Sequence, residues 1–262
     1  MRFGTRLVAA VAAFGLAWGL ADGARAQSQA PVQWGGLYVG GNAGYGVATA
    51  NTTGEIRYDN FGYFNRTSTP AYATAAIGRV KPRSFMGGVT AGYNWQSGAL
   101  VYGAEFDFAH LRAGATRTSG AVYPCCAPSS FQVEQSVKLN YVATLRARAG
   151  YASDRWLVYG TAGAAFTTLK YSESFTDNFA GANELGSQSG TRTGWVVGMG
   201  AEYALGEHWS MKGEYQHVDF GSMNGAGGIL SDNLGNRYPM NVYTHAVNVR
   251  LDMWRVGVNY RF

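Results

Sequence analysis

The stretch WRVGVNYRF, residues 254–262 at the C-terminus, decides the fold. Apolar or aromatic side chains occupy every second position from Trp254 to Phe262, and Arg255, Asn259 and Arg261 stand between them. This alternation is typical of a β-strand whose two faces meet different surroundings. We therefore predict a strand here, with one apolar face and one polar, basic face.

The same alternation recurs along the chain in segments rich in glycine and aromatic residues. In the second segment, Phe85 and Tyr93 lie on one face, and Thr90 and Asn94 lie on the other. The fifth segment is too mixed for its faces to be assigned. The period of two predicts eight strands: Leu37–Ala50, Ser84–Trp95, Leu100–His110, Ser136–Tyr151, Trp156–Tyr171, Thr193–Leu205, Trp209–Asp219 and His245–Phe262.

The links between these strands are alternately short and long. Residues 96–99, 152–155 and 206–208 form short links, and residues 51–83, 111–135, 172–192 and 220–244 form long ones. Outer-membrane β-barrels have short periplasmic turns and long external loops. We therefore predict an all-β, eight-stranded antiparallel transmembrane β-barrel with four long extracellular loops and both ends in the periplasm. A soluble sandwich would also alternate, with its apolar face turned inward.

The N-terminus indicates export. Arg2 and Arg6 precede an apolar run that ends before Ala24-Arg25-Ala26, a small-x-small cleavage pattern. We predict that residues 1–26 are a signal peptide, that the mature protein begins at Gln27, and that residues 27–262 form the barrel domain. A retained N-terminal anchor helix is the alternative, although the apolar run is too short for a bilayer of about 30 Å.

Composition and charge exclude other classes of protein. The chain has 37 Gly in 262 residues, about twice the usual share, and only 14% charged residues. Its net charge is +5, and the predicted signal peptide contains three Arg and one Asp, which leaves +3 on the mature part. This mild, dispersed excess does not form the basic patch that nucleic-acid binding needs.

Several segments resemble a known family. The segment WGGLYVGGNAGYG, residues 34–46, resembles the opening strand of small porin-like barrels of the opacity-protein or OmpA type. Residues 87–95, 101–107, 213–221 and 256–262 resemble their second, third, seventh and eighth strands. The resemblance implies an eight-stranded barrel of the Gram-negative outer membrane, with variable, often immunogenic surface loops and no defined catalytic activity. Because the chain stops at the eighth strand, we expect no periplasmic peptidoglycan-binding domain.

The strand phases predict a charged interior. An eight-stranded barrel has barely enough room for its own side chains, and buried charges must be paired. We expect these charges to neutralise one another as a plug, and the alternative is a charged eyelet that tunes ion passage. The predicted network comprises Glu105, Asp107, Arg146, Arg148, Glu202, Lys212, Glu214, Arg255 and Arg261.

The sequence gives weaker indications of chemistry elsewhere. His110, His208, His217 and His245 have no metal-ligand spacing, so we predict no metal and no cofactor, although a loop His or Tyr could bind haem. A lipid A-modifying enzyme would need a set such as Ser174, His245 and Asp177, whose spacing is not diagnostic.

Two cysteines are adjacent in the second long link. A disulfide is typical of exported proteins, but Cys125 and Cys126 could close one only as a distorted ring. Free thiols, a vicinal bridge and a mixed disulfide all remain open at this point.

The sequence therefore predicts an outer-membrane structural and surface barrel that supports envelope integrity, displays its loops and has no catalytic residues. A narrow diffusion channel or a haem-binding or ligand-binding surface protein is the alternative, followed by the lipid A enzyme. The expected partners are outer-membrane lipids, lipopolysaccharide and the barrel-assembly machinery, which would read Tyr260 and Phe262. We expect a monomer with no nucleic-acid partner.

Overall fold

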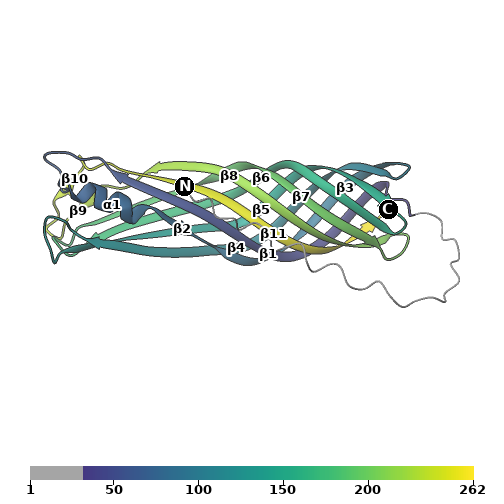
Figure 1. The fold of residues 1–262 in the computed structure, drawn as a ribbon, viewed down its shortest axis with the longest axis horizontal. Coiled ribbons are helices and arrows are strands. Elements are labelled where there is room, and N and C mark those ends of the chain that lie inside the picture. The colour runs from purple at the N-terminus through teal and green to yellow at the C-terminus, as the bar shows by residue number, and fades with distance from the viewer. Residues whose placement is uncertain (1–31) are drawn as a thin grey trace, which may run out of the picture. The chain divides into compact units, whose positions relative to one another are not determined.

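The computed structural model describes residues 32–262, so the predicted signal peptide lies outside the described residues. Eight long antiparallel strands form a closed ring (Figure 1). The eight-stranded barrel predicted from the sequence is confirmed. The ring strands are β1 (Gly36–Ile56), β3 (Arg83–Ser97), β4 (Leu100–Val122), β5 (Ser130–Ser153), β6 (Trp156–Asp177), β7 (Asn183–Ala204), β8 (Trp209–Ala226) and β11 (Tyr243–Arg261).

Four short elements lie between the ring strands. Helix α1 (Ser68–Ala76) and strand β2 (Gly78–Val80) follow β1, and β9 (Leu230–Ser231) and β10 (Arg237–Tyr238) precede β11. The described residues contain no helix of the length and apolarity needed to cross a membrane.

The first and last strands close the ring. β1 pairs with β11 from Tyr38 opposite Arg261 to Ile56 opposite Tyr243. The start of β1 and the C-terminus therefore lie at the same end of the barrel, where the three short turns also lie (Figure 1). The barrel has no free sheet edge at this end, which removes the aggregation risk that an unpaired strand brings.

The strands extend well beyond their predicted bounds at the opposite end. β4 continues to Val122, and β5 begins at Ser130, so most of the predicted loop 111–135 is strand. In the same way, β6 and β7 take up most of residues 172–192. These two long links are therefore mainly extensions of the barrel wall.

The outer surface carries two rings of aromatic residues. Trp156 packs on Tyr203 near the short turns, with ring centroids 4.8 Å apart, and Tyr215 packs on Trp254 further up the wall, at 5.4 Å. Exposed apolar side chains lie between the two rings. This is the lipid-facing band and the paired aromatic girdles of a membrane barrel. The apolar residues include Val89, Phe106, Leu145, Val158, Met199, Met211, Val256 and Val258.

Beyond the upper girdle, the outward-facing residues become polar, as Arg112, Glu134, Lys138 and Lys170 illustrate. Along β11, this polar wall runs from Trp254 to Tyr243. At about 3.3 Å per residue and a tilt of about 40°, it extends about 28 Å above the lipid band. The protein therefore projects a folded column from the membrane.

Candidate functional site: the filled interior

The interior of the barrel is built from one face of every strand. Successive residues of a strand point to opposite sides, so the inward residues of β4 follow one another at every second position. From the short-turn end, they begin with Val101, the acids Glu105 and Asp107, and the apolar Leu111. At the far end, Tyr123, just after β4, is buried in an aromatic cluster. The interior is thus arranged in layers of different chemistry.

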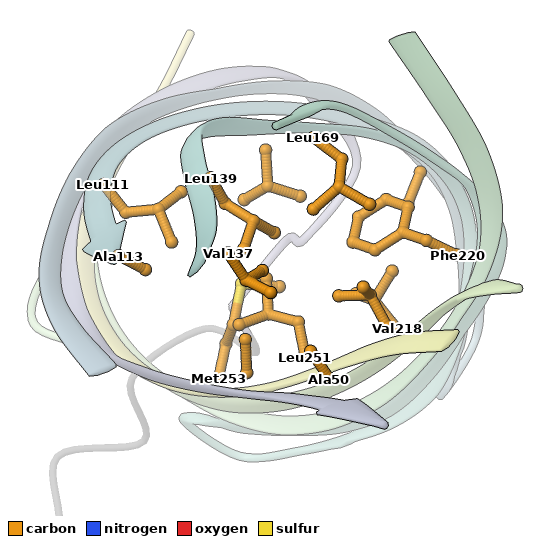
Figure 2. Close-up of a cluster of buried hydrophobic side chains, with 14 of the residues drawn as sticks. Ala50, Leu111, Ala113, Val137, Leu139, Leu169, Val218, Phe220, Leu251 and Met253 are labelled. Carbon is orange, nitrogen blue, oxygen red and sulfur yellow. The ribbon is translucent and has the colours of Figure 1, made fainter. Parts of the chain in front are cut away.

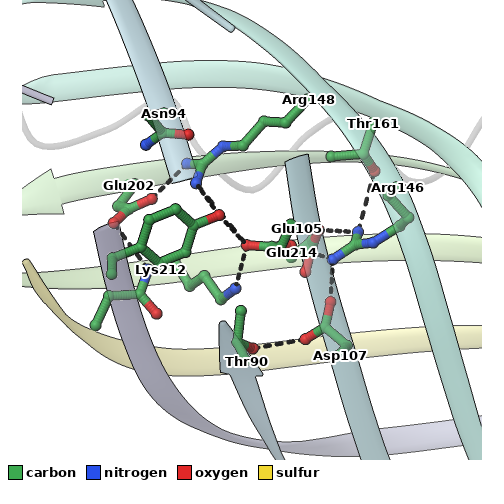
Figure 3. A network of polar contacts seen from close by, with 12 residues as sticks. Thr90, Asn94, Glu105, Asp107, Arg146, Arg148, Thr161, Glu202, Lys212 and Glu214 are labelled. Carbon is green, nitrogen blue, oxygen red and sulfur yellow. Dashed lines mark hydrogen bonds and ion pairs between the residues drawn. The ribbon is translucent and has the colours of Figure 1, made fainter. Parts of the chain in front are cut away.

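The charged layer brings together eight of the nine predicted network residues. Figure 3 labels all of them except Arg255. Arg146 on β5 forms ion pairs with Glu105, Asp107 and Glu214. Arg255 on β11 lies 3.2 Å from Asp107 and 2.5 Å from Glu214. These five side chains are almost completely buried, so each charge depends on its partners rather than on water.

A second group of pairs lies on the side of the short turns. Arg148 pairs with Glu202, and its guanidinium lies 3.8 Å from the centre of the Tyr159 ring. The Lys212 Nζ lies 3.1 Å from Glu105, which also accepts a hydrogen bond of 2.8 Å from the Tyr38 hydroxyl. The charged layer therefore contains four acids and four bases, and its formal charges cancel.

Arg261 lies outside this network. Its side chain is buried, but it donates hydrogen bonds to the backbone carbonyls of Gln33 and Glu207, at 2.7 and 3.1 Å. The guanidinium also lies 4.5 Å from the centre of the Trp34 ring. Its predicted inward direction is right, but its predicted place in the charge network is wrong. Arg261 is at the very end of β11, below the acids, where it joins the segment before β1 to the turn between β7 and β8.

A hydrophobic layer lies beyond the charges and was not predicted. Figure 2 shows its side chains converging on the barrel interior from several strands. They are fully or almost fully buried. Charged side chains at these positions would be buried without partners, which is energetically costly. Its large members include Leu111, Val137, Leu139, Leu169, Val218, Phe220, Leu251 and Met253.

A polar cluster follows above the hydrophobic layer. The Glu173 carboxylate accepts hydrogen bonds from the hydroxyls of Tyr72 and Tyr171 and from the Gln135 amide, the last two at 2.6 and 3.1 Å. Glu184 accepts a hydrogen bond from the Gly228 backbone. Burial raises the pKa of Glu184 to about 7 and lowers that of His245. No sequence pattern indicates this cluster, because Glu173 and Glu184 fall in the predicted loop 172–192.

An aromatic cluster closes the far end. The Phe175 ring lies 5.4 Å from Phe64 and 5.7 Å from Phe131, and Tyr72 of α1 lies 5.5 Å from Tyr243. α1 packs against β1 and β4, so the residues between β1 and β3 cover this end of the barrel. Within residues 32–262, Cys125 and Cys126 form a vicinal disulfide in the turn beside this cluster.

The four histidines are dispersed. His110 faces outward, and His208 stacks on Tyr260. His217 lies 2.8 Å from Asp252, and buried His245 packs against Tyr171. No group of three or more metal-binding side chains occurs in the described part of the chain.

The side chains considered for a lipid A enzyme do not converge. Ser174 faces outward between buried Glu173 and Phe175. His245 is buried on the inner side of the wall, and Asp177 accepts hydrogen bonds at the far tip. Residues 32–262 therefore do not assemble Ser174, His245 and Asp177 into one site.

Comparison with known proteins agrees with this architecture. The family model of the outer membrane protein beta-barrel domain matches residues 12–262. The chain is 33% identical to the 31 kDa outer-membrane immunogenic protein of Brucella melitensis biotype 1, over 90% of this chain and 88% of that protein. It is 28% identical to a 22 kDa outer membrane protein of Rhizobium leguminosarum bv. viciae, over 74% of this chain and 70% of that one.

Among solved structures, the Neisserial surface protein A is similar at 15% identity and a TM-score of 0.36, covering 86% of this chain and 97% of that structure. The family model spans nearly the whole chain, and the Brucella protein matches it over most of both lengths. The chain belongs to the outer-membrane β-barrel family and is a protein of the bacterial outer membrane.

Proposed function

We propose that this protein is a closed structural barrel that supports the integrity of the outer membrane and holds a folded column at the cell surface. The observation that carries the proposal is the filled interior. A charged layer and a hydrophobic layer follow each other along the same barrel, and the buried side chains of both layers are in contact with protein. An ion that crossed the barrel would have to displace the side chains of the charged layer. It would then have to pass the hydrophobic layer without polar ligands.

The charge balance supports a closed barrel over an eyelet. An eyelet that selects ions presents charged side chains to water in the pore, whereas Arg146, Glu105 and Glu214 have side chains with no exposed area. The alternative of a narrow diffusion channel would require this network and the hydrophobic layer to move aside together.

The column supports a role in surface display. Its outer wall is polar, and its inner side is packed with aromatic and hydrogen-bonded side chains. The connections between β4 and β5 and between β6 and β7 are short. A rigid wall holds the connections between β4 and β5 and between β6 and β7 well above the lipid surface. These connections are therefore accessible to molecules outside the cell.

A non-catalytic role also agrees with the site geometry. The acids and bases of the charged layer neutralise one another, and they are buried away from any substrate. The side chains considered for lipid A chemistry face different sides of the wall. We infer that the buried polar groups stabilise the barrel.

The proposal is tested in cells that lack the gene. We expect loss of the protein to increase sensitivity to bile salts and uptake of a hydrophobic dye, and the wild-type gene to restore both. The variant Arg112→Ala, changed on the exposed wall, serves as the matched control and should restore both as well. Unchanged detergent sensitivity, combined with slower uptake of small hydrophilic solutes, would overturn the structural role in favour of a channel.

A further inference from the structure

A small cavity opens at the far tip of the barrel, away from the filled interior. Its volume is about 130 Å³. It is lined by aromatic residues from three separate connections, Tyr63 before α1, Tyr123 after β4, and Phe179 after β6, and by the disulfide of Cys125 and Cys126. Segments far apart in the sequence therefore build one cavity.

The rings form walls that stand at steep angles to one another. Tyr63 and Phe179 have centroids 6.2 Å apart and an interplanar angle of 76°, and Tyr123 and Phe179 are also 6.2 Å apart, at 69°. The Phe179 ring is about half exposed, so it stands at the mouth. Rings set in this way present more than one electron-rich face to a group held among them.

A carboxylate lies behind two of these walls, at the hydroxyl groups of their rings. The hydroxyls of Tyr63 and Tyr123 both donate to the same oxygen of Asp177, at 2.5 and 2.7 Å. Its other oxygen accepts a hydrogen bond of 2.9 Å from the Ala182 backbone. In the described part of the chain, no basic side chain forms an ion pair with Asp177. The carboxylate makes the phenol rings more electron-rich and places a negative charge directly behind them.

Electron-rich ring faces next to a carboxylate that has no basic partner attract a small organic cation. A cation is held when it lies within about 6 Å of an aromatic centroid, and quaternary ammonium groups are recognised by cages of this kind. Taking about 30 Å³ for a water-sized group, the cavity holds about four such groups. A trimethylammonium group is of this order of size, and its methyl groups suit the apolar disulfide wall.

We propose that the cavity lined by Tyr63, Tyr123 and Phe179 binds a quaternary ammonium group, such as the head group of choline. Asp177 supports the site from behind, through its hydrogen bonds to the two tyrosine hydroxyls. The site lies at the outermost end of the protein, where a ligand reaches it from outside the cell. It does not depend on whether the interior of the barrel is closed.

The test compares choline with 3,3-dimethylbutan-1-ol, which has the same shape and no charge. Binding to the refolded mature chain is measured by calorimetry in octyl glucoside, a detergent without choline or amine oxide groups. We expect choline to bind at least about tenfold more tightly than the neutral alcohol. Equal binding of the two, or no binding of choline at millimolar concentration, would overturn the proposal.

Variants locate the site. Asp177→Asn should reduce the preference for choline over the alcohol, and Phe179→Leu should weaken choline binding several-fold. Phe61→Leu is the matched control, because Phe61 is highly exposed and does not line the cavity, and it should leave binding unchanged. Phe179 is exposed enough for its variant to fold, so choline binding unaffected by Phe179→Leu contradicts the site even if Asp177→Asn fails to fold.

Discussion

Arg146 on β5 pairs with Glu214 on β8 across the interior of the barrel, although β6 and β7 separate the two strands in the ring. The pair therefore joins different parts of the wall rather than adjacent strands. Arg146 also pairs with Glu105 and Asp107 on the neighbouring strand β4. One guanidinium thus serves three carboxylates, which makes Arg146 the centre of the charged layer.

Replacing Arg146 should destabilise the barrel strongly. Arg146→Ala leaves three buried carboxylates without their shared partner, and breaking a buried ion pair typically costs about 3–5 kcal/mol. We expect a clearly lower urea midpoint for unfolding of the refolded protein. Arg112→Ala, on the exposed wall, should change the free energy of unfolding by less than about 0.5 kcal/mol. Equal midpoints for the two variants would contradict the buried position of Arg146.

The far end of the barrel should contribute to stability even though the sequence places it in loops. Phe175 is fully buried among Phe64, Phe131 and Tyr243. Phe175→Ala should therefore reduce the free energy of unfolding by about 3–5 kcal/mol. Phe61→Ala, at a highly exposed position, serves as the control and should have little effect. If both variants unfold like the wild type, the far end is not packed as described.

Stability should depend on pH through Glu184, which lies beyond the membrane-spanning part of β7. Burial raises the pKa of Glu184 to about 7, above its ordinary value of 4.5. Between these values the folded protein keeps a proton that the unfolded chain has released. Raising the pH through this range therefore lowers stability, and the loss is complete above about pH 7.

Glu184→Gln removes the titration of this side chain and so isolates the effect. The stability of the wild type relative to Glu184→Gln should be higher at pH 4.5 than at pH 7.5, as measured by urea unfolding at both values. A difference between the two proteins that stays constant over this range would show that Glu184 does not titrate in this way.

The last strand should be needed for assembly. Tyr260 packs on Trp209 with ring centroids 5.0 Å apart, and exposed Phe262 lies 5.2 Å from Tyr260. We expect the insertion machinery to recognise this aromatic end, so deletion of Phe262 should lower the amount of folded barrel in the outer membrane. Heat-modifiable mobility on cold gels measures that amount. Normal amounts of the shifted form would count against an assembly role.

Part of this architecture was predictable because it rests on a period of two. Glu105 and Arg146 lie on the polar faces of strongly alternating segments, so their inward direction could be read from the sequence. Their spatial partners could not, because Glu214 belongs to a strand that is not adjacent to β5, and register around a ring is not encoded locally. For the same reason, the sequence did not indicate that Arg261 lies nearer the short turns than the charged layer does.

The hydrophobic layer was hidden by changes of phase. The register between β4 and β5 shifts between His110 and Ala113, and the register between β5 and β6 shifts between Leu139 and Ala143. In β5 the shift interrupts the alternation, because Leu139 and Val142 both face the interior, whereas β4 keeps its phase through Ala109, Leu111 and Ala113. The predicted third strand ends at His110 because the outward residues beyond it, beginning with Arg112, are no longer apolar. The prediction therefore places Leu111 at the start of a loop, although its side chain faces the interior. The small and polar outward residues beyond that point strengthen the impression of a loop.

The central claim is that the interior is closed, and single-channel recording in planar lipid bilayers tests it most directly. The refolded mature protein, inserted at a concentration at which a large porin gives regular current steps, should give no steady conductance in 1 M KCl. Steady, uniform current steps from the wild-type protein would contradict the account, because ions would then be crossing both the charged layer around Arg146 and the hydrophobic layer around Leu139.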